Sequence, residues 1–123
     1  MKVTAVLEER YVPKWNGNRE LPDAEQVTVE IKWPTNAERE NLKGYKISPQ
    51  TSEVSVYFNT ERILENHVTK VTGLEVSQNG KTVKIKNGHD LAASNVLALG
   101  GLIDEIKAYV TSEDGLTEEQ EKN

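Results

Sequence analysis

The residue types that most often do chemistry are scarce in this sequence of 123 residues. It contains no cysteine, which excludes disulfides, thiol nucleophiles and thiolate zinc sites, and it contains two histidines. His67 falls on an apolar stripe beside Val68 and Val71, where a satisfied core histidine is commoner than a ligand. His89 precedes Asp90, and two adjacent residues do not place two ligands on one ion without a third from elsewhere. We therefore expect no metal and no cofactor.

Motifs for catalysis are equally weak. Gly80-Lys81-Thr82 imitates the end of a phosphate-binding loop, but Glu75 stands where that loop needs glycine, and the surrounding pattern is a hairpin. Paired carboxylates such as Glu8 with Glu9 lie outside any apolar run that would raise a pKa for general-acid catalysis. The sequence also lacks a nucleophile elbow and a dinucleotide fingerprint. These patterns indicate a protein that is not an enzyme.

The charge is concentrated at one end of the chain. The net charge is −5, and residues 104–123 hold seven acidic residues against two lysines. The remaining residues are balanced, so they create no positive field for nucleic acid. We predict one domain over 1–111 and an acidic, flexible tail over 112–123. The least polar stretch, 91–103, is shorter than the roughly 20 residues of a membrane span, and we expect a soluble, intracellular protein.

The spacing of apolar residues predicts about five strands. Val27, Val29, Ile31 and Trp33 alternate with polar residues, as in a strand with one buried face. Asn79-Gly80 is the strongest hairpin signal, because both residues tolerate a positive φ. The predicted strands are 3–12, 27–33, 54–58 and the two that flank Asn79-Gly80. The segments 14–23 and 46–52 are predicted connections.

Three helices are predicted between and after these strands. Thr35 and Glu38 form a capping box for a short helix that Gly44 ends, and a second helix runs from Asn59 or Thr60 to Val71. The third, C-terminal helix begins at Asp90 or Ser94, and Gly100-Gly101 marks a bend or a close contact that can divide it. This order predicts an α+β fold: a mostly antiparallel sheet of about five strands, helices packed on one side, and a C-terminal helix.

The apolar face of the C-terminal helix is wider than a two-layer domain needs, and Trp15 lies in a polar connection. Core packing and partner binding are both open for these residues. As partner-binding candidates we select Trp15, Leu99, Leu102, Ile103, Ile106 and Tyr109. An apolar groove beside the acidic end would suit a basic, amphipathic helix.

Motifs in both halves of the chain carry a family resemblance. The N-terminal motifs are Arg10-Tyr11-Val12-Pro13, Gly17-Asn18, Leu21-Pro22, residues 25–29, Trp33-Pro34-Thr35 and Glu38-Arg39. The C-terminal motifs are a helix over 59–71, Gly73-Leu74-Glu75-Val76 with its hairpin, residues 102–106, Leu116-Thr117-Glu118-Glu119 and Glu121-Lys122-Asn123. Their order resembles small proteins encoded among the tail genes of tailed bacteriophages and prophages, and is similar to phage tail assembly chaperones.

The resemblance implies a non-catalytic protein that holds the long helical tape-measure protein and recruits tail-tube subunits in the cytoplasm of the bacterial host. Homo-oligomers are compatible with it. The alternative is a virion structural protein of the neck, tail or capsid, in which the loops 14–24 and 44–52 would pack against neighbouring subunits in a ring.

Overall fold

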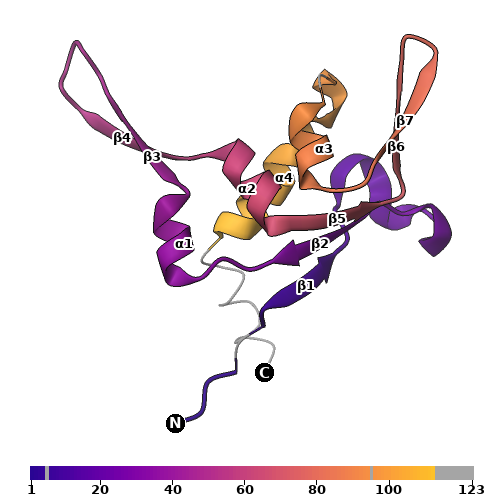
Figure 1. Cartoon of the computed structure of the whole chain (residues 1–123), viewed down its shortest axis with the longest axis horizontal. Helices are drawn as coiled ribbons and strands as arrows, with labels where there is room; N and C mark the ends of the chain where they lie inside the picture. Colours follow the sequence, from indigo (N-terminus) through magenta and orange to yellow (C-terminus); the bar gives the residue numbers. More distant parts are fainter. Residues whose placement is uncertain (5, 95, 113–123) are drawn as a thin grey trace.

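The computed structural model of the chain describes residues 1–4, 6–94 and 96–112, and mixes short strands with short helices along the sequence (Figure 1). The strands are β1 (Glu8–Tyr11), β2 (Thr28–Lys32), β3 (Lys43–Ile47), β4 (Val54–Phe58), β5 (Val68–Thr72), β6 (Leu74–Gln78) and β7 (Lys81–Ile85). The α-helices are α1 (Asn36–Asn41), α2 (Thr60–His67), α3 (Gly88–Ala93) and α4 (Gly100–Thr111). The 3₁₀ helices are η1 (Trp15–Glu20), η2 (Asp23–Glu25) and η3 (Leu97–Leu99).

The predicted α+β class is confirmed, with antiparallel strands and a C-terminal helix, and the strands divide among three small sheets. The central sheet has the order β1-β2-β5, while β3 with β4 and β6 with β7 form two separate hairpins. Figure 1 shows both hairpins projecting from the body of the molecule in different directions. The hairpin at Asn79-Gly80 is confirmed, with φ of 52° and 78° at the two turn residues.

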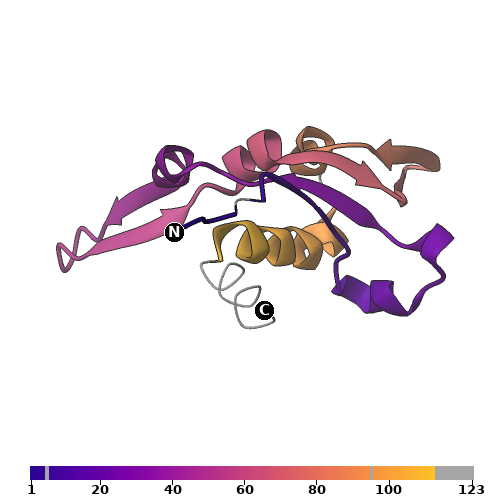
Figure 2. The ribbon, with the colours of Figure 1, turned by 90° about the horizontal axis from the view of Figure 1, so that it is seen from below.

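The core lies between the central sheet and α4. Val29 and Ile31 of β2 are buried, and so are Leu102, Ile106 and Val110 on one face of α4. The two sets belong to one cluster of buried residues. Figure 2 shows α4 in a layer of its own, beneath the level of α2 and α3. None of the helices in the described part of the chain is long and apolar enough to cross a membrane.

A buried asparagine organises the connection between β1 and β2. The side-chain amide of Asn18 donates to the carbonyl oxygens of Pro13 and Val27, at 2.9 Å each, and its oxygen accepts from the Val27 amide at 2.7 Å. Backbone groups that a loop would leave unsatisfied are thereby paired. This segment was predicted as a connection, and it contains η1 and η2.

The capping box of α1 is confirmed. Thr35 Oγ1 accepts from the Glu38 amide at 3.1 Å, and the Glu38 carboxylate accepts from the Thr35 amide at 3.3 Å. That second hydrogen bond, from the backbone of Thr35, is the main reason why the pKa of Glu38 is lowered. Gly44 does not end this helix as predicted, because α1 stops at Asn41 and Gly44 lies in β3.

The predicted second helix is wrong in its last turn, since α2 ends at His67 and Val68 begins β5. Val68 and Val71 are three residues apart, which suits a helix face. In the structure they pair with Ile31 and Val29, and a bulge between these two pairs keeps both valines on the buried side of the strand. The same spacing therefore fits a bulged strand.

Two further boundaries differ from the prediction. The strand predicted from Val3 starts only at Glu8. Its partner β2 ends at Lys32, the Trp33 amide still donates to the Leu7 carbonyl, and Pro34 then has no N–H to continue the ladder. The C-terminal helical region is divided, and Asn87 caps α3 instead of Asp90 or Ser94.

The predicted domain end at residue 111 coincides with the end of α4. Of the predicted acidic tail, residues 113–123 lie outside the described residues.

Two glycines at helix starts give a matched stability test. A Cβ on Gly88 would collide with the Leu64 carbonyl and come within 2.8 Å of Val68 Cβ, whereas a Cβ on Gly100 would meet no atom within 4 Å. Gly88→Ala should therefore lower the free energy of unfolding by about 1–3 kcal/mol. Gly100→Ala should raise it by about 0.4–1 kcal/mol, since Gly100 already has a helical φ of −55°.

Urea unfolding of the two variants and the wild type measures both effects. Equal destabilisation by the two substitutions would contradict the close packing of α3 on α2.

Candidate protein-binding surface

The structure places the six predicted partner-binding residues in or against the core. Leu99, Leu102 and Ile106 are at most 3% exposed, so these three side chains offer no surface to a partner in this fold. Trp15, Ile103 and Tyr109 are half-buried and pack against the same core. The breadth of the apolar face on α4 is explained by its neighbours: α4 contacts α2 and η1, and its buried residues share one core cluster with those of the central sheet.

Gly101 leaves the space in which the Trp15 ring packs against α4. A Cβ on Gly101 would lie 3.2 Å from the Trp15 ring, so a side chain there would crowd the indole. The sequence interpretation of Gly100-Gly101 as a close contact thus holds at Gly101. Trp15 and α4 were predicted as parts of one surface, and the structure does bring them together, with their apolar faces turned inward.

Aromatic and polar contacts fasten α4 to β1. The rings of Tyr11 and Tyr109 stack with centroids 4.0 Å apart, and Trp33 lies 5.2 Å from Tyr109. The Glu105 carboxylate accepts from the Tyr11 hydroxyl at 2.6 Å and from the Lys14 amide at 2.7 Å. Burial, and then the neighbouring Glu105, raise the pKa of Tyr11 to about 12. This side of α4 is a structural contact.

Neither histidine is assembled into a reactive cluster. His67 is buried, and its Nδ1 lies 2.9 Å from the Lys32 carbonyl, which agrees with the prediction of a satisfied core histidine. His89 is exposed and pairs with the Glu65 carboxylate at 2.9 Å. In the described ranges, no group of three or more histidine, aspartate or glutamate side chains is arranged to hold a metal ion.

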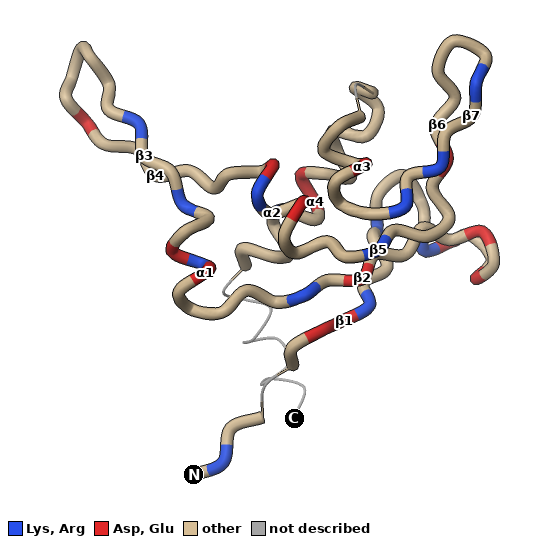
Figure 3. Tube along the Cα trace, in the orientation of Figure 1, with Lys and Arg blue, Asp and Glu red and all other residues tan. Residues whose placement is uncertain are grey.

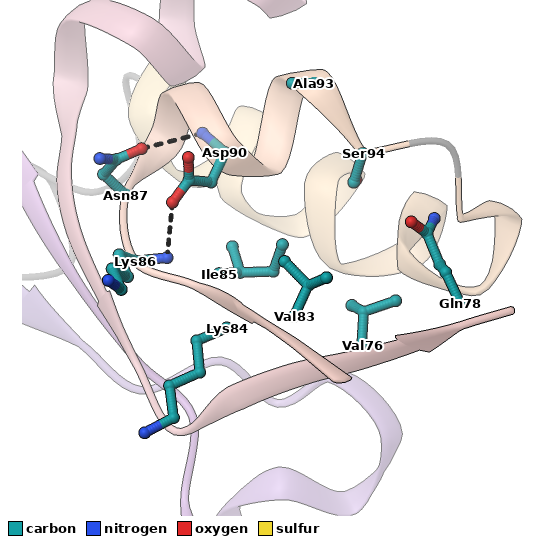
Figure 4. A pocket seen from close by; sticks show the side chains of 10 residues that line it. All are labelled: Val76, Gln78, Val83, Lys84, Ile85, Lys86, Asn87, Asp90, Ala93 and Ser94. Carbon is teal, nitrogen blue, oxygen red and sulfur yellow. Dashed lines mark hydrogen bonds between the residues drawn. The ribbon is translucent and has the colours of Figure 1, made fainter. Parts of the chain in front are cut away.

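One pocket of about 530 Å³ lies between the β6–β7 hairpin and α3 (Figure 4). Val76, Val83 and Ile85 form its apolar wall. The Asp90 carboxylate, which also lines the pocket, accepts a hydrogen bond from the Lys86 amide at 3.0 Å. Figure 4 shows the Lys84 side chain turned away from α3. The pocket can receive an apolar group against its wall of Val76, Val83 and Ile85.

The most exposed apolar side chains of any sheet lie on the β3–β4 hairpin, residues 43–58, which we call the arm. Tyr45 pairs with Val56 and Ile47 with Val54, so all four side chains lie on one face of the ribbon. Their exposed fractions are 61%, 57%, 69% and 61% in that order. We call these four residues the apolar face of the arm. In Figures 1 and 2 no other part of the described chain lies beside it.

The opposite face of the arm is closed by its own side chains. The Tyr57 ring lies across Gly44, where an added Cβ would overlap it. Lys46 Nζ lies 5.2 Å from the centre of the same ring, in a cation–π contact. Figure 3 shows the charges of the arm on β3 and near its tip, with none along β4. The arm therefore has a polar, self-covered face and an open apolar face.

The root of the arm is fixed to the body. Leu42 is 3% exposed and belongs to the core, and its carbonyl accepts from the Asn59 amide at 2.7 Å. Asn59 also caps α2 by accepting from the Arg62 amide, and the Arg62 guanidinium donates to the Asn41 carbonyl at 3.1 Å. Core packing and hydrogen bonds therefore fix both strands of the arm at the point where they leave the body.

Sequence reasoning missed the arm as a surface. Residues 46–52 were predicted as loop, and the alternation of Val54 and Val56 was interpreted only as a strand, without its apolar side being recognised as exposed. The available signals were the alternation of Tyr45 and Ile47 with Gly44 and Lys46, and the absence of charge over 54–58.

The Tyr11–Glu105 contact predicts a pH dependence. A Tyr11 pKa raised from 10.0 to about 12 means that the stabilisation is complete below pH 10 and is lost as the pH rises towards 12. Tyr11→Phe keeps the ring stack but removes the hydroxyl. It should therefore cost about 1 kcal/mol at neutral pH.

The difference between this variant and the wild type should shrink between pH 10 and about 12, as followed by urea unfolding across that range. A difference independent of pH would contradict the raised pKa of Tyr11 in the folded protein.

Comparison of the chain with models of protein families, with curated proteins and with solved structures gives no match.

Proposed function

We propose that this chain is a non-catalytic morphogenesis protein of a tailed bacteriophage, similar to a tail assembly chaperone, and that it binds its client through the apolar face of the arm. The observation that carries the proposal is the exposure of Tyr45, Ile47, Val54 and Val56 on one face of a projecting ribbon. Contiguous exposed apolar residues of this kind are typical of protein interaction sites. The sequence resemblance supplies the phage context.

The client of such a protein is the helical tape-measure protein, and tail-tube subunits are its second partner. A client helix exposes an apolar stripe before assembly, and an apolar ribbon face can cover that stripe. The polar opposite face, with Lys46 over Tyr57, keeps the arm solvated on its other side. The place of action under this proposal is the cytoplasm of the bacterial host.

The client site thus moves from the C-terminal helix to the arm. The side chains of Leu102 and Ile106 are already used to cover the central sheet. Those on the apolar face of the arm remain more than half exposed in the part of the chain that the structure describes.

A virion structural protein of the neck, tail or capsid is the second candidate. It is favoured by the two hairpins that project from the body, since arms of this kind can reach neighbouring subunits in a ring (Figure 1). The arm includes the 44–52 segment that this alternative assigns to subunit contacts.

Paired lysine substitutions test the client site. Ile47→Lys puts a charge on the apolar face, whereas Ser48→Lys puts the same charge on the adjacent residue, whose side chain leaves the ribbon on the other side. Each variant is co-expressed with the tape-measure protein of the same tail gene cluster, and the soluble complex is quantified. Losing the burial of one isoleucine is worth about 1.5–3 kcal/mol, so Ile47→Lys should weaken binding about 10- to 100-fold.

Ser48→Lys should retain wild-type binding. Equal binding by both variants would remove the arm from the client site. Mass spectrometry of purified virions distinguishes the two candidates, because a chaperone is absent from mature particles and a structural protein is present in them.

A further inference from the structure

We infer that β4 is a dimerisation edge, at which the β4 strand of a second copy of this chain pairs antiparallel to form a four-stranded sheet in the order β3-β4-β4-β3. This goes beyond the proposed function, because it concerns self-association and holds whatever the client is. It rests on the open main-chain groups of β4 and on the distribution of charge among the strands.

The register of the arm identifies which main-chain groups are open. The amide of Ser48 donates to Glu53 and that of Asn59 to Leu42, so the hydrogen-bonded pairs of this ribbon contain the even-numbered residues of the first strand. In an antiparallel ladder the intervening pairs direct their N–H and C=O groups outwards. On β4 the outward groups therefore belong to Val54, Val56 and Phe58.

The absence of charged side chains distinguishes β4 from the other strands as the edge that can pair with a second copy. Among the seven strands of the described residues, β4 is the one without a charged side chain, with the sequence Val-Ser-Val-Tyr-Phe. Charged residues, lysine above all, are what protects an edge strand from pairing, and β3 carries Lys43 and Lys46. Pairing two β3 edges would bring four lysines to one seam, whereas pairing two β4 edges brings none.

A second copy also supplies what the arm lacks. An isolated two-stranded hairpin is marginally stable in water, and three or more strands with an apolar face are needed for independent stability. A two-fold axis perpendicular to the joined sheet leaves Tyr45, Ile47, Val54 and Val56 of both copies on the same face. The dimer therefore has one continuous apolar surface of eight side chains, with the lysines of β3 along its outer edges.

Two proline variants of the full chain test the seam. Val56→Pro removes an outward N–H from β4, and Tyr45→Pro removes the outward N–H of its cross-strand partner on β3. Proline is tolerated on an edge strand where its nitrogen faces outward. Each variant loses one side chain from the apolar face, and the two variants differ in the strand edge from which the N–H is removed.

Sedimentation equilibrium should show a dimer for the wild type. It should show at least a tenfold higher dissociation constant for Val56→Pro and a change of less than about threefold for Tyr45→Pro. A monomeric wild type, or equal weakening by both prolines, would overturn the inference. Equal weakening would indicate face-to-face packing of two arms.

Amide hydrogen exchange on the wild type provides a measurement that does not depend on how the variants fold. The amides of Val54 and Val56 should become protected as the protein concentration rises through the dimer range. The outward amides of Tyr45 and Ile47 on β3 should stay fast throughout. If the two pairs of amides respond alike, or neither responds, β4 is not the seam.

Discussion

The packing of α4 on the central sheet is the contact on which the rest of this structure depends. Val29 and Ile31 of the sheet and Leu102, Ile106 and Val110 of α4 are all buried in one cluster. Because residues distant in sequence supply the two halves, the body closes only when the C-terminal helix returns to strands from the first third of the chain. The stack of Tyr11 and Tyr109 then fixes the helix at its edge.

The core does not cover all seven strands of the described residues. The central sheet packs against α4, whereas the two hairpins project from the body, and they differ in how much of their apolar surface is buried (Figure 1). The β6–β7 hairpin keeps Val76 and Ile85 buried near α3 and so remains part of the body at its base. The arm buries little beyond its root at Leu42, and its apolar side chains stay in solvent. Local burial, more than composition, separates the apolar side chains that form the core from those of the proposed client site.

Local signals in the sequence predicted the local structure well. The Thr35–Glu38 capping box and the Asn79-Gly80 turn depend on residues a few positions apart, and both are confirmed. Val68 and Val71 were assigned to a helix because a bulge, which depends on the opposite strand, cannot be recognised from spacing alone. The alternation of Val54 and Val56 correctly predicted a strand, but which sheet a strand joins decides whether its apolar side is covered.

The root of the arm has a mechanical consequence. Both strands enter the body through neighbouring residues, with Leu42 seated in the core and Asn59 bonded to it while capping α2. A load applied at the tip is therefore shared by the two strands and delivered to two hydrogen bonds, Asn59 to Leu42 and Arg62 to Asn41, and to the start of α2. Tension applied to the arm would therefore be transmitted both to the core, through Leu42, and to the first turn of α2, through Asn59.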